Sequence, residues 1–133
     1  MIHRYAVTIL AVVMIALALS ACAGGAGVVT SASTISVEAT EFAFTPNAFT
    51  AQVGEELTFE ITNNGTLEHN FVVLDPSGNE LARTSIAVAA TESVKIVLVE
   101  GGTYTIVCDI EGHQVAGMEA ALTVQGVATR REP

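Results

Sequence analysis

The chain has 133 residues, which is enough for one domain and too few for two. Its 14 acidic residues outnumber the 5 basic ones and give a formal charge of −9 at pH 7. A chain with so few cations cannot neutralise a run of phosphates, so the composition excludes a nucleic-acid partner. We therefore interpret the sequence as one acidic domain that binds no nucleic acid.

The amino-terminal segment has the features of an export signal. Arg4 precedes an apolar run at residues 6–19, and small residues follow this run. The sequence LSAC, which ends at Cys22, resembles the lipobox of bacterial lipoproteins. We expect residues 1–21 to be a lipoprotein-type signal peptide and Cys22 to carry the lipid. The alternatives are a plain signal peptide, or an uncleaved anchor in which Cys22 is incidental.

The remainder of the chain divides by composition. Residues 22–33 are small, Gly-rich and uncharged, which predicts a flexible tether behind the lipid. We expect residues 34–125 to form the domain and residues 126–133 a disordered tail. The lipid would hold the domain outside the cytoplasm, in the periplasm or on the outer face of the cytoplasmic membrane. With Cys22 acylated, Cys108 has no disulfide partner in this oxidising compartment, and a metal bond would explain the lone thiol.

Short β-rich runs separated by turn signals fill the domain. Apolar and polar residues alternate at 34–39 and at 57–62, as in strands with one buried face. Further strands are predicted at residues 48–53, 69–74, 93–99, 103–108 and 119–124, with a bend at 42–47. Short strands with a turn signal roughly every 8–12 residues predict an all-β fold, an antiparallel Greek-key β-sandwich.

The residues with distinctive chemistry gather in one stretch, TYTIVCDIEGHQVAGM. It contains Cys108, His113 and Met118 at five-residue intervals. A loop between two strands at one end of the sandwich would let the three side chains converge. His69 begins an earlier strand and can close the site from a neighbouring part of the sheet. Two His and one Cys, with a long bond to Met, are typical of a mononuclear electron-transfer copper site.

The order of these residues resembles a known family. The sequence HNFV at residues 69–72, followed by Y-x3-C-x4-H-x4-M at residues 104–118, is similar to the cupredoxins, the type I blue copper proteins. Within that family the loop looks most like the auracyanin type, whereas the plastocyanin type has a shorter gap between Cys and His. The resemblance covers roughly residues 34–125.

The resemblance implies a cofactor and a role for each residue. One type I copper ion, cycling between Cu(II) and Cu(I), would have His69, Cys108 and His113 as equatorial ligands and Met118 as the axial ligand. Asn70 would form a hydrogen bond near the thiolate and tie the two ligand segments together, which tunes the reduction potential.

The ligand loop departs from the family pattern at one place. Glu111 stands where the family usually has Pro, and Asp109 directly follows Cys108. Two carboxylates beside the site should favour Cu(II) and lower the potential, if solvent does not screen them. They also put an apolar docking face in doubt, although residues 115–117 offer a small apolar rim.

These observations predict a one-electron carrier rather than an enzyme. We expect a monomer that exchanges electrons with a redox donor and acceptor, such as a cytochrome or a membrane complex. A copper enzyme would need further His ligands, and both His residues of the domain are already used. The alternative function is copper binding and delivery outside the cytoplasm. Taken singly, Cys108 or Met118 could be a core residue, His113 a surface residue and His69 a strand cap.

Overall fold

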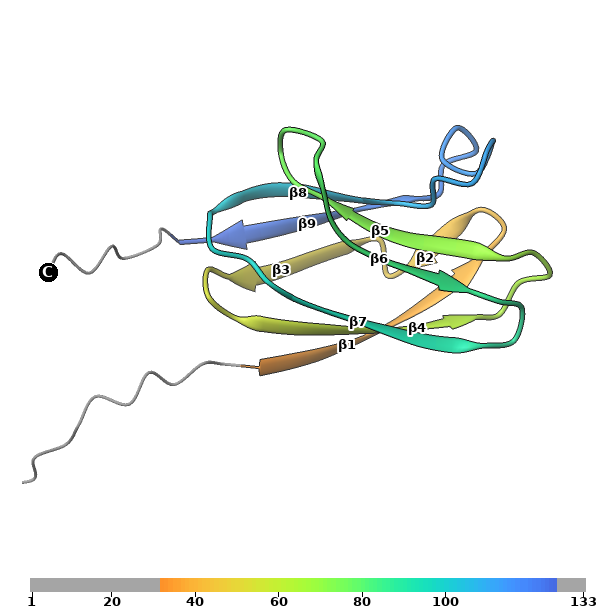
Figure 1. The fold of residues 1–133 in the computed structure, drawn as a ribbon, viewed down its shortest axis with the longest axis horizontal. Coiled ribbons are helices and arrows are strands. Elements are labelled where there is room, and N and C mark those ends of the chain that lie inside the picture. The colour runs from red at the N-terminus through yellow and green to blue at the C-terminus, as the bar shows by residue number, and fades with distance from the viewer. Residues whose placement is uncertain (1–31, 127–133) are drawn as a thin grey trace, which may run out of the picture.

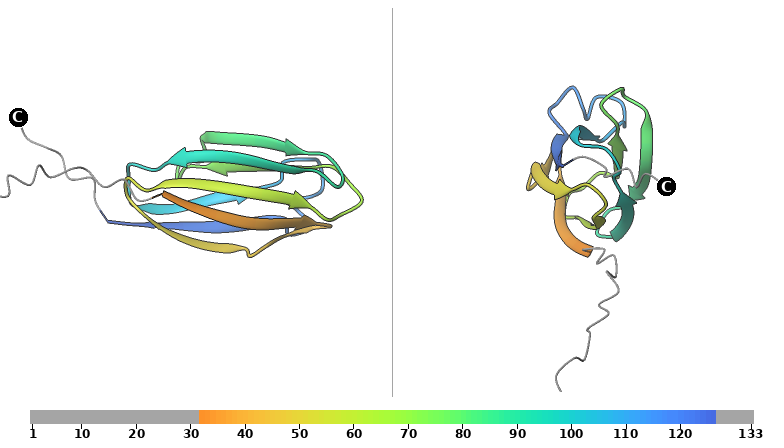
Figure 2. Two further views of the ribbon diagram at one scale, coloured as in Figure 1. Left: turned by 90° about the horizontal axis from the view of Figure 1, so that it is seen from below. Right: turned by 90° about the vertical axis from the view of Figure 1, so that its left-hand side faces the viewer.

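The computed structural model describes residues 32–126 and folds them into two β-sheets that pack face to face (Figure 1, Figure 2). The predicted signal peptide, the lipidation site Cys22, most of the predicted tether and residues 127–133 of the tail lie outside the described residues. The first strand begins at Ala32, so the last two residues of the expected tether belong to a strand. Within residues 32–126, no helix has the length and apolar character needed to cross a membrane.

The described residues form nine strands. They are β1 (Ala32–Thr40), β2 (Ala43–Thr45), β3 (Ala48–Gln52), β4 (Glu56–Asn63), β5 (His69–Leu74), β6 (Glu80–Ile86), β7 (Thr91–Val97), β8 (Gly102–Val107) and β9 (Glu119–Gln125). One sheet has the order β2-β1-β4-β7 and the other the order β3-β9-β8-β5-β6. The predicted all-β sandwich is confirmed. Its sheets are mixed, because β1 pairs in parallel with β4 and β3 in parallel with β9.

Two edge strands were not predicted from the sequence. The expected bend at residues 42–47 contains β2, which has only three residues and pairs with the end of β1. The sequence of β6 has polar side chains on both faces, and within it only Ile86 is buried. The apolar and polar alternation that marks a half-buried strand is therefore weak in this sequence.

Four phenylalanines join the two sheets at the centre of the core. Phe44 and Phe59 come from one sheet, and Phe49 and Phe71 come from the other. The ring of Phe71 lies 5.3 Å from that of Phe44 and 5.2 Å from that of Phe59, while Phe49 and Phe59 are 5.3 Å apart. These centroid distances and tilted or edge-on orientations are favourable for aromatic pairs. The chain of rings therefore links the two sheets through the core.

Asn63 organises the loop between β4 and β5. Its side chain is 1% exposed, and its Nδ2 donates hydrogen bonds to the carbonyls of Leu67 (2.7 Å) and Ile86 (3.0 Å). Its Oδ1 accepts a hydrogen bond from the backbone N–H of Gly65 (2.9 Å). This one amide therefore replaces the backbone pairing that the loop lacks.

Replacing Asn63 by Ala is expected to lower the free energy of unfolding by about 2–3 kcal/mol, because one buried and two partly buried backbone groups would lose their partner. Urea unfolding of the variant measures this loss. The neighbouring Asn64 is exposed, and Asn64→Ala should change the free energy of unfolding by less than about 0.5 kcal/mol. Equal losses for the two variants would contradict the role given to Asn63.

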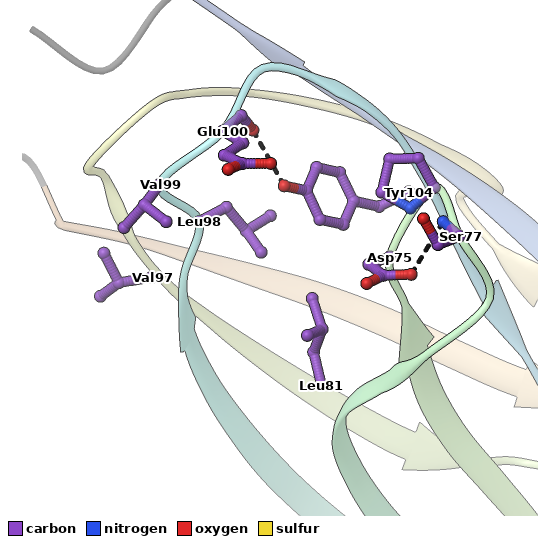
Figure 3. Close-up of a pocket in the computed structure, with 9 residues that line it drawn as sticks. Asp75, Ser77, Leu81, Val97, Leu98, Val99, Glu100 and Tyr104 are labelled. Atoms are coloured by element: carbon purple, nitrogen blue, oxygen red, sulfur yellow. Dashed lines mark hydrogen bonds between the residues drawn. The ribbon is translucent and has the colours of Figure 1, made fainter.

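The two ends of the sandwich differ in chemistry. The end where β8 finishes and β5 begins carries the Cys and His residues, and the β8–β9 loop projects from it (Figure 1). The opposite end has an open pocket of about 280 Å³ between the β5–β6 turn and the β7–β8 loop (Figure 3). There the hydroxyl of Tyr104 donates a hydrogen bond to the carbonyl of Glu100 (2.9 Å), which closes the β7–β8 loop. The residues that line the pocket, both polar and aliphatic, include none of the predicted metal ligands.

Candidate metal centre

The ligand loop is folded back on itself by backbone hydrogen bonds. Cys108 directly follows β8, and its N–H donates to the carbonyl of Met118 (3.1 Å). The N–H of Met118 in turn donates to the carbonyl of His113 (3.1 Å). The three predicted ligands of this loop are thus linked through their main chain, and their separation does not depend on side-chain contacts alone.

Two glycines permit this tight path. Gly112 and Gly117 have φ angles of 86° and 107°, a region that residues with a Cβ rarely adopt. The N–H of His113 donates to the carbonyl of Ile110 (3.0 Å), which closes a turn over residues 110–113. The glycines on either side of His113 therefore let the loop reverse direction while the imidazole points into the protein.

The structure brings three of the predicted ligands together. His69, at the start of β5, is fully buried, as is Cys108, and His113 is 7% exposed. The Nδ1 atoms of the two imidazoles are 3.3 Å apart, and Cys108 Sγ lies 3.4 Å from His113 Nδ1. The candidate ligand atoms of all three residues lie within 4.8 Å of one another. Met118, on the same loop, is fully buried.

The chemistry of this donor set fits a metal ion. Burial, and to a lesser extent the nearby His113, hold the pKa of His69 below its ordinary value, so its imidazole is neutral at pH 7. Neutral imidazole and thiolate are the forms that bind metals. A single proton can bridge only two of the three atoms His69 Nδ1, His113 Nδ1 and Cys108 Sγ. A cation between them can bind all three. With Met118, these residues form a type I copper-like site.

Asn70 connects the ligand loop to the sheet. Its backbone N–H donates to Cys108 Sγ (3.3 Å), and its Nδ2 donates to Asp109 Oδ1 (2.8 Å). Its own Oδ1 accepts a hydrogen bond from the hydroxyl of Ser85 on β6 (2.7 Å). Asn70 therefore orients the sulfur and its following residue at the same time, and such contacts tune the properties of a metal ligand.

Arg83 offsets part of the charge of Asp109. Arg83 Nη2 on β6 lies 2.5 Å from Asp109 Oδ2 and 2.8 Å from a carboxylate oxygen of Glu80. Hydrogen bonds from Arg83 and then from Asn70 hold the pKa of Asp109 below its ordinary value, so it is ionised. The lowering of the potential that the sequence predicts from Asp109 and Glu111 is therefore offset in part at Asp109 by Arg83. Arg83 was missed because the sequence gives no signal for β6.

The ring of Phe42 packs against the imidazole of His113. The ring of Phe42 packs edge-on against that of His113 with 4.8 Å between centroids, and 36% of Phe42 is exposed. Val115, in the ligand loop, is 95% exposed. Phe42, in the segment between β1 and β2, thus adds a second apolar surface to the rim predicted at residues 115–117. No sequence pattern distinguishes Phe42 from the core phenylalanines that follow it.

Comparison with known proteins places the chain in a family. A cupredoxin-like domain profile matches residues 8–124. The chain belongs to the cupredoxin-like family. Over 91 residues it is 40% identical to plastocyanin from Solanum tuberosum and 38% identical to plastocyanin from Capsella bursa-pastoris. Each match covers 62% of this chain and 87% of the plastocyanin, and the resemblance to cupredoxins in the sequence is thereby confirmed.

Solved structures confirm the fold of this cupredoxin-like protein. Reduced auracyanin from Roseiflexus castenholzii has a TM-score of 0.66 at 22% identity, and the match covers 72% of this chain and 99% of that one. Auracyanin A from Chloroflexus aurantiacus, described as a "blue" copper protein, has a TM-score of 0.63 at 20% identity. That match covers 71% of this chain and all of the other.

Proposed function

We propose that this cupredoxin-like protein is a one-electron carrier that binds one copper ion through His69, Cys108, His113 and Met118. The observation that carries the proposal is the buried convergence of one thiol and two imidazole Nδ1 atoms beside Met118. A copper ion bound there would supply reversible one-electron chemistry. Thiolate and thioether ligands suit Cu(I), and imidazole suits both oxidation states. The plastocyanin relatives support the same function.

The chain's own residues would give a partner access on one side. His69 and Cys108 are fully buried, whereas His113 is 7% exposed and packs against Phe42, which is itself 36% exposed. A redox partner that covers this apolar rim would bring its own centre closest to His113 and would exclude water from the contact. We therefore assign the edge of His113 as the point of electron entry and exit.

The same geometry favours a carrier over an enzyme. Four protein donors leave no open position for a substrate, whereas catalytic metal sites keep one open. Among residues 32–126, one cluster of His, Cys and acidic side chains has metal-binding geometry, and it is the group already assigned. The proposed ligands therefore account for a single copper ion and provide no second centre.

The proposal includes a location and partners. Residues 1–21 would direct export, Cys22 would carry a lipid, and residues 22–33 would tether the domain at 34–125 to the outer face of a membrane, with a tail at 126–133. The donor and acceptor would be cytochromes or membrane complexes. Without residues 1–21 the chain loses Arg4 and keeps 4 basic against 14 acidic residues, and a formal charge of −10 suits partners with a basic surface, since complementary charge speeds encounter. We propose that the carrier works as a monomer.

Electron transfer and copper delivery make different predictions for one experiment. The Cu(I)-loaded protein is mixed with an oxidised cytochrome of basic surface, and both centres are followed by absorbance. The copper of a carrier should be oxidised by the cytochrome and stay bound, and an added chemical reductant should return it to Cu(I) over repeated cycles. In a parallel sample, a Cu(I)-binding competitor should remove little copper on that timescale. Rapid loss of copper to the competitor without electron exchange would favour delivery outside the cytoplasm and would overturn the carrier.

Arg83 should raise the reduction potential, because its charge offsets that of Asp109 beside the site. Arg83→Gln is expected to lower the potential by roughly 20–60 mV, since 59 mV corresponds to a tenfold change in a one-electron equilibrium. Voltammetry of the copper-loaded variant measures the shift. Lys95→Gln removes an exposed cation on β7 and serves as the control, because Lys95 contacts Glu56 instead. Equal shifts in both variants would rule out the specific role of Arg83.

A further inference from the structure

The second ring nitrogen of His69 faces a carboxylate. His69 Nε2 is buried and has no hydrogen-bond partner among the described residues. The nearest charged atom across from it is Glu41 Oε1, at 3.6 Å. This distance is only a few tenths of an ångström, roughly, beyond that of a hydrogen bond. The buried Nε2 of His69 therefore faces one acceptor, Glu41 Oε1, and a small movement of either side chain would complete a hydrogen bond between them.

The position of this carboxylate is built into the fold. Glu41 Oε1 accepts hydrogen bonds from the backbone N–H groups of Thr66 (2.7 Å) and Leu67 (2.8 Å). A Cβ at Gly65 would collide with the same carboxylate, so the loop leaves space for it by omitting a side chain. These loop residues directly precede His69. The contacts therefore hold Glu41 in place independently of the imidazole.

The two nitrogens of His69 have separate tasks in this arrangement. Nδ1 points to His113, within the proposed metal site, and Nε2 points to Glu41. A neutral imidazole that binds a metal through Nδ1 carries its proton on Nε2 and can donate from there. Hydrogen bonds from the backbone N–H groups of Leu67 and Thr66 hold the pKa of Glu41 below its ordinary value, so Glu41 is an ionised carboxylate that can accept a hydrogen bond.

We propose that Glu41 is a positioning residue for His69: it accepts a hydrogen bond from Nε2–H, which fixes the tautomer with Nδ1 free for metal, and it adds negative charge that favours Cu(II). The inference rests on the proposed copper function. It assigns to this chain a carboxylate–histidine–metal relay, in which the outer partner raises the basicity of the ligand. The carboxylate does not contact the metal position itself and acts only through the imidazole.

The main test replaces Glu41 by Gln. The amide oxygen of Gln can still accept from Thr66 and Leu67, so the loop keeps its anchor while the negative charge is lost. Cu(II) affinity, measured by competition with a chelator, should fall by about 10- to 100-fold. The reduction potential should rise, because Cu(II) loses more stabilisation than Cu(I). Glu100→Gln is the matched control: the substitution removes the same charge, and Glu100 lines the pocket between the β5–β6 turn and the β7–β8 loop, away from the proposed ligands (Figure 3).

A second readout does not depend on copper. In the metal-free protein, nitrogen-15 NMR of His69 should show the tautomer with the proton on Nε2, and exchange of this proton with solvent should be slow. In Glu41→Gln the Nε2–H signal should shift and the tautomer should become mixed. This measurement on the wild-type protein stands even if the variant folds poorly.

The outcomes separate the inference from the function on which it rests. If Glu41→Gln and Glu100→Gln bind Cu(II) equally and the His69 tautomer is unchanged, Glu41 anchors the loop only and the inference is overturned. A type I spectrum of the wild-type protein would leave the carrier function standing in that case. If wild-type protein lacks a type I spectrum but shows the Nε2–H tautomer that Glu41→Gln disturbs, the proposed function fails while the positioning of His69 by Glu41 is retained.

Discussion

Cys108→Ser should abolish the intense thiolate-to-copper absorption of the copper-loaded protein. The band requires a sulfur–copper bond, and Cys108 Sγ is the thiol that lies 3.4 Å from His113 Nδ1 at the centre of the proposed site. A serine hydroxyl is a harder and much less acidic ligand, so Cu(I) in particular loses its preferred partner. Visible absorption of wild type and variant at equal copper loading measures the effect, and nearly all of the band is expected to disappear.

The chain provides a matched control for this substitution. Cys22→Ser removes the other cysteine, which the proposal assigns to lipidation and not to metal binding. Its copper spectrum should equal that of the wild-type protein. Retention of the intense band in Cys108→Ser, or its loss in Cys22→Ser, would contradict the ligand assignment.

Phe71→Ala should destabilise the fold by about 3–5 kcal/mol. Phe71 is fully buried and contacts the rings of both Phe44 and Phe59, so truncation removes apolar contacts and leaves a cavity between the sheets. Since domains are stable by only about 5–15 kcal/mol, the loss should bring the protein close to unfolding. Urea unfolding of the metal-free protein measures the change without a contribution from bound copper.

Phe42 provides the comparison for the core aromatic. It is 36% exposed and packs against His113 at the rim, so Phe42→Ala should lower the free energy of unfolding by less than about 1.5 kcal/mol. A small effect of Phe71→Ala, similar to that of Phe42→Ala, would show that the ring cluster is not the centre of the core.

The fold was predictable where one strand face packs against the core. The strand at residues 69–74 was expected with the same bounds that β5 has, and β4 shows the expected alternation at Leu57, Phe59 and Ile61. The parallel pairing of β1 with β4 and of β3 with β9 was not predictable, because alternation shows which side is buried but not which strand lies alongside. Strand β6 was missed because its burial pattern is that of a largely exposed edge.

The candidate ligands were predictable for a chemical reason. A thiol, a thioether and two imidazoles are uncommon side chains, and their spacing restricts how a loop can bring them together. Glu41, Arg83 and Phe42 are ordinary residue types whose importance depends on a tertiary contact. Arg83 lies in a strand that was absent from the prediction, Phe42 in a bend that was described only coarsely, and Glu41 between that bend and the preceding strand. The surroundings of the metal centre therefore became visible only in three dimensions.

The central claim is most directly tested by loading the protein with one equivalent of Cu(II) and recording its absorption and EPR spectra on the same sample. A type I site predicts an intense absorption band in the red, a narrow copper hyperfine splitting and saturation at one copper per chain. A greener protein with a second strong band at shorter wavelength would keep the ligand set with a stronger bond to Met118. A colourless protein with an ordinary tetragonal Cu(II) spectrum would contradict the electron-carrier assignment.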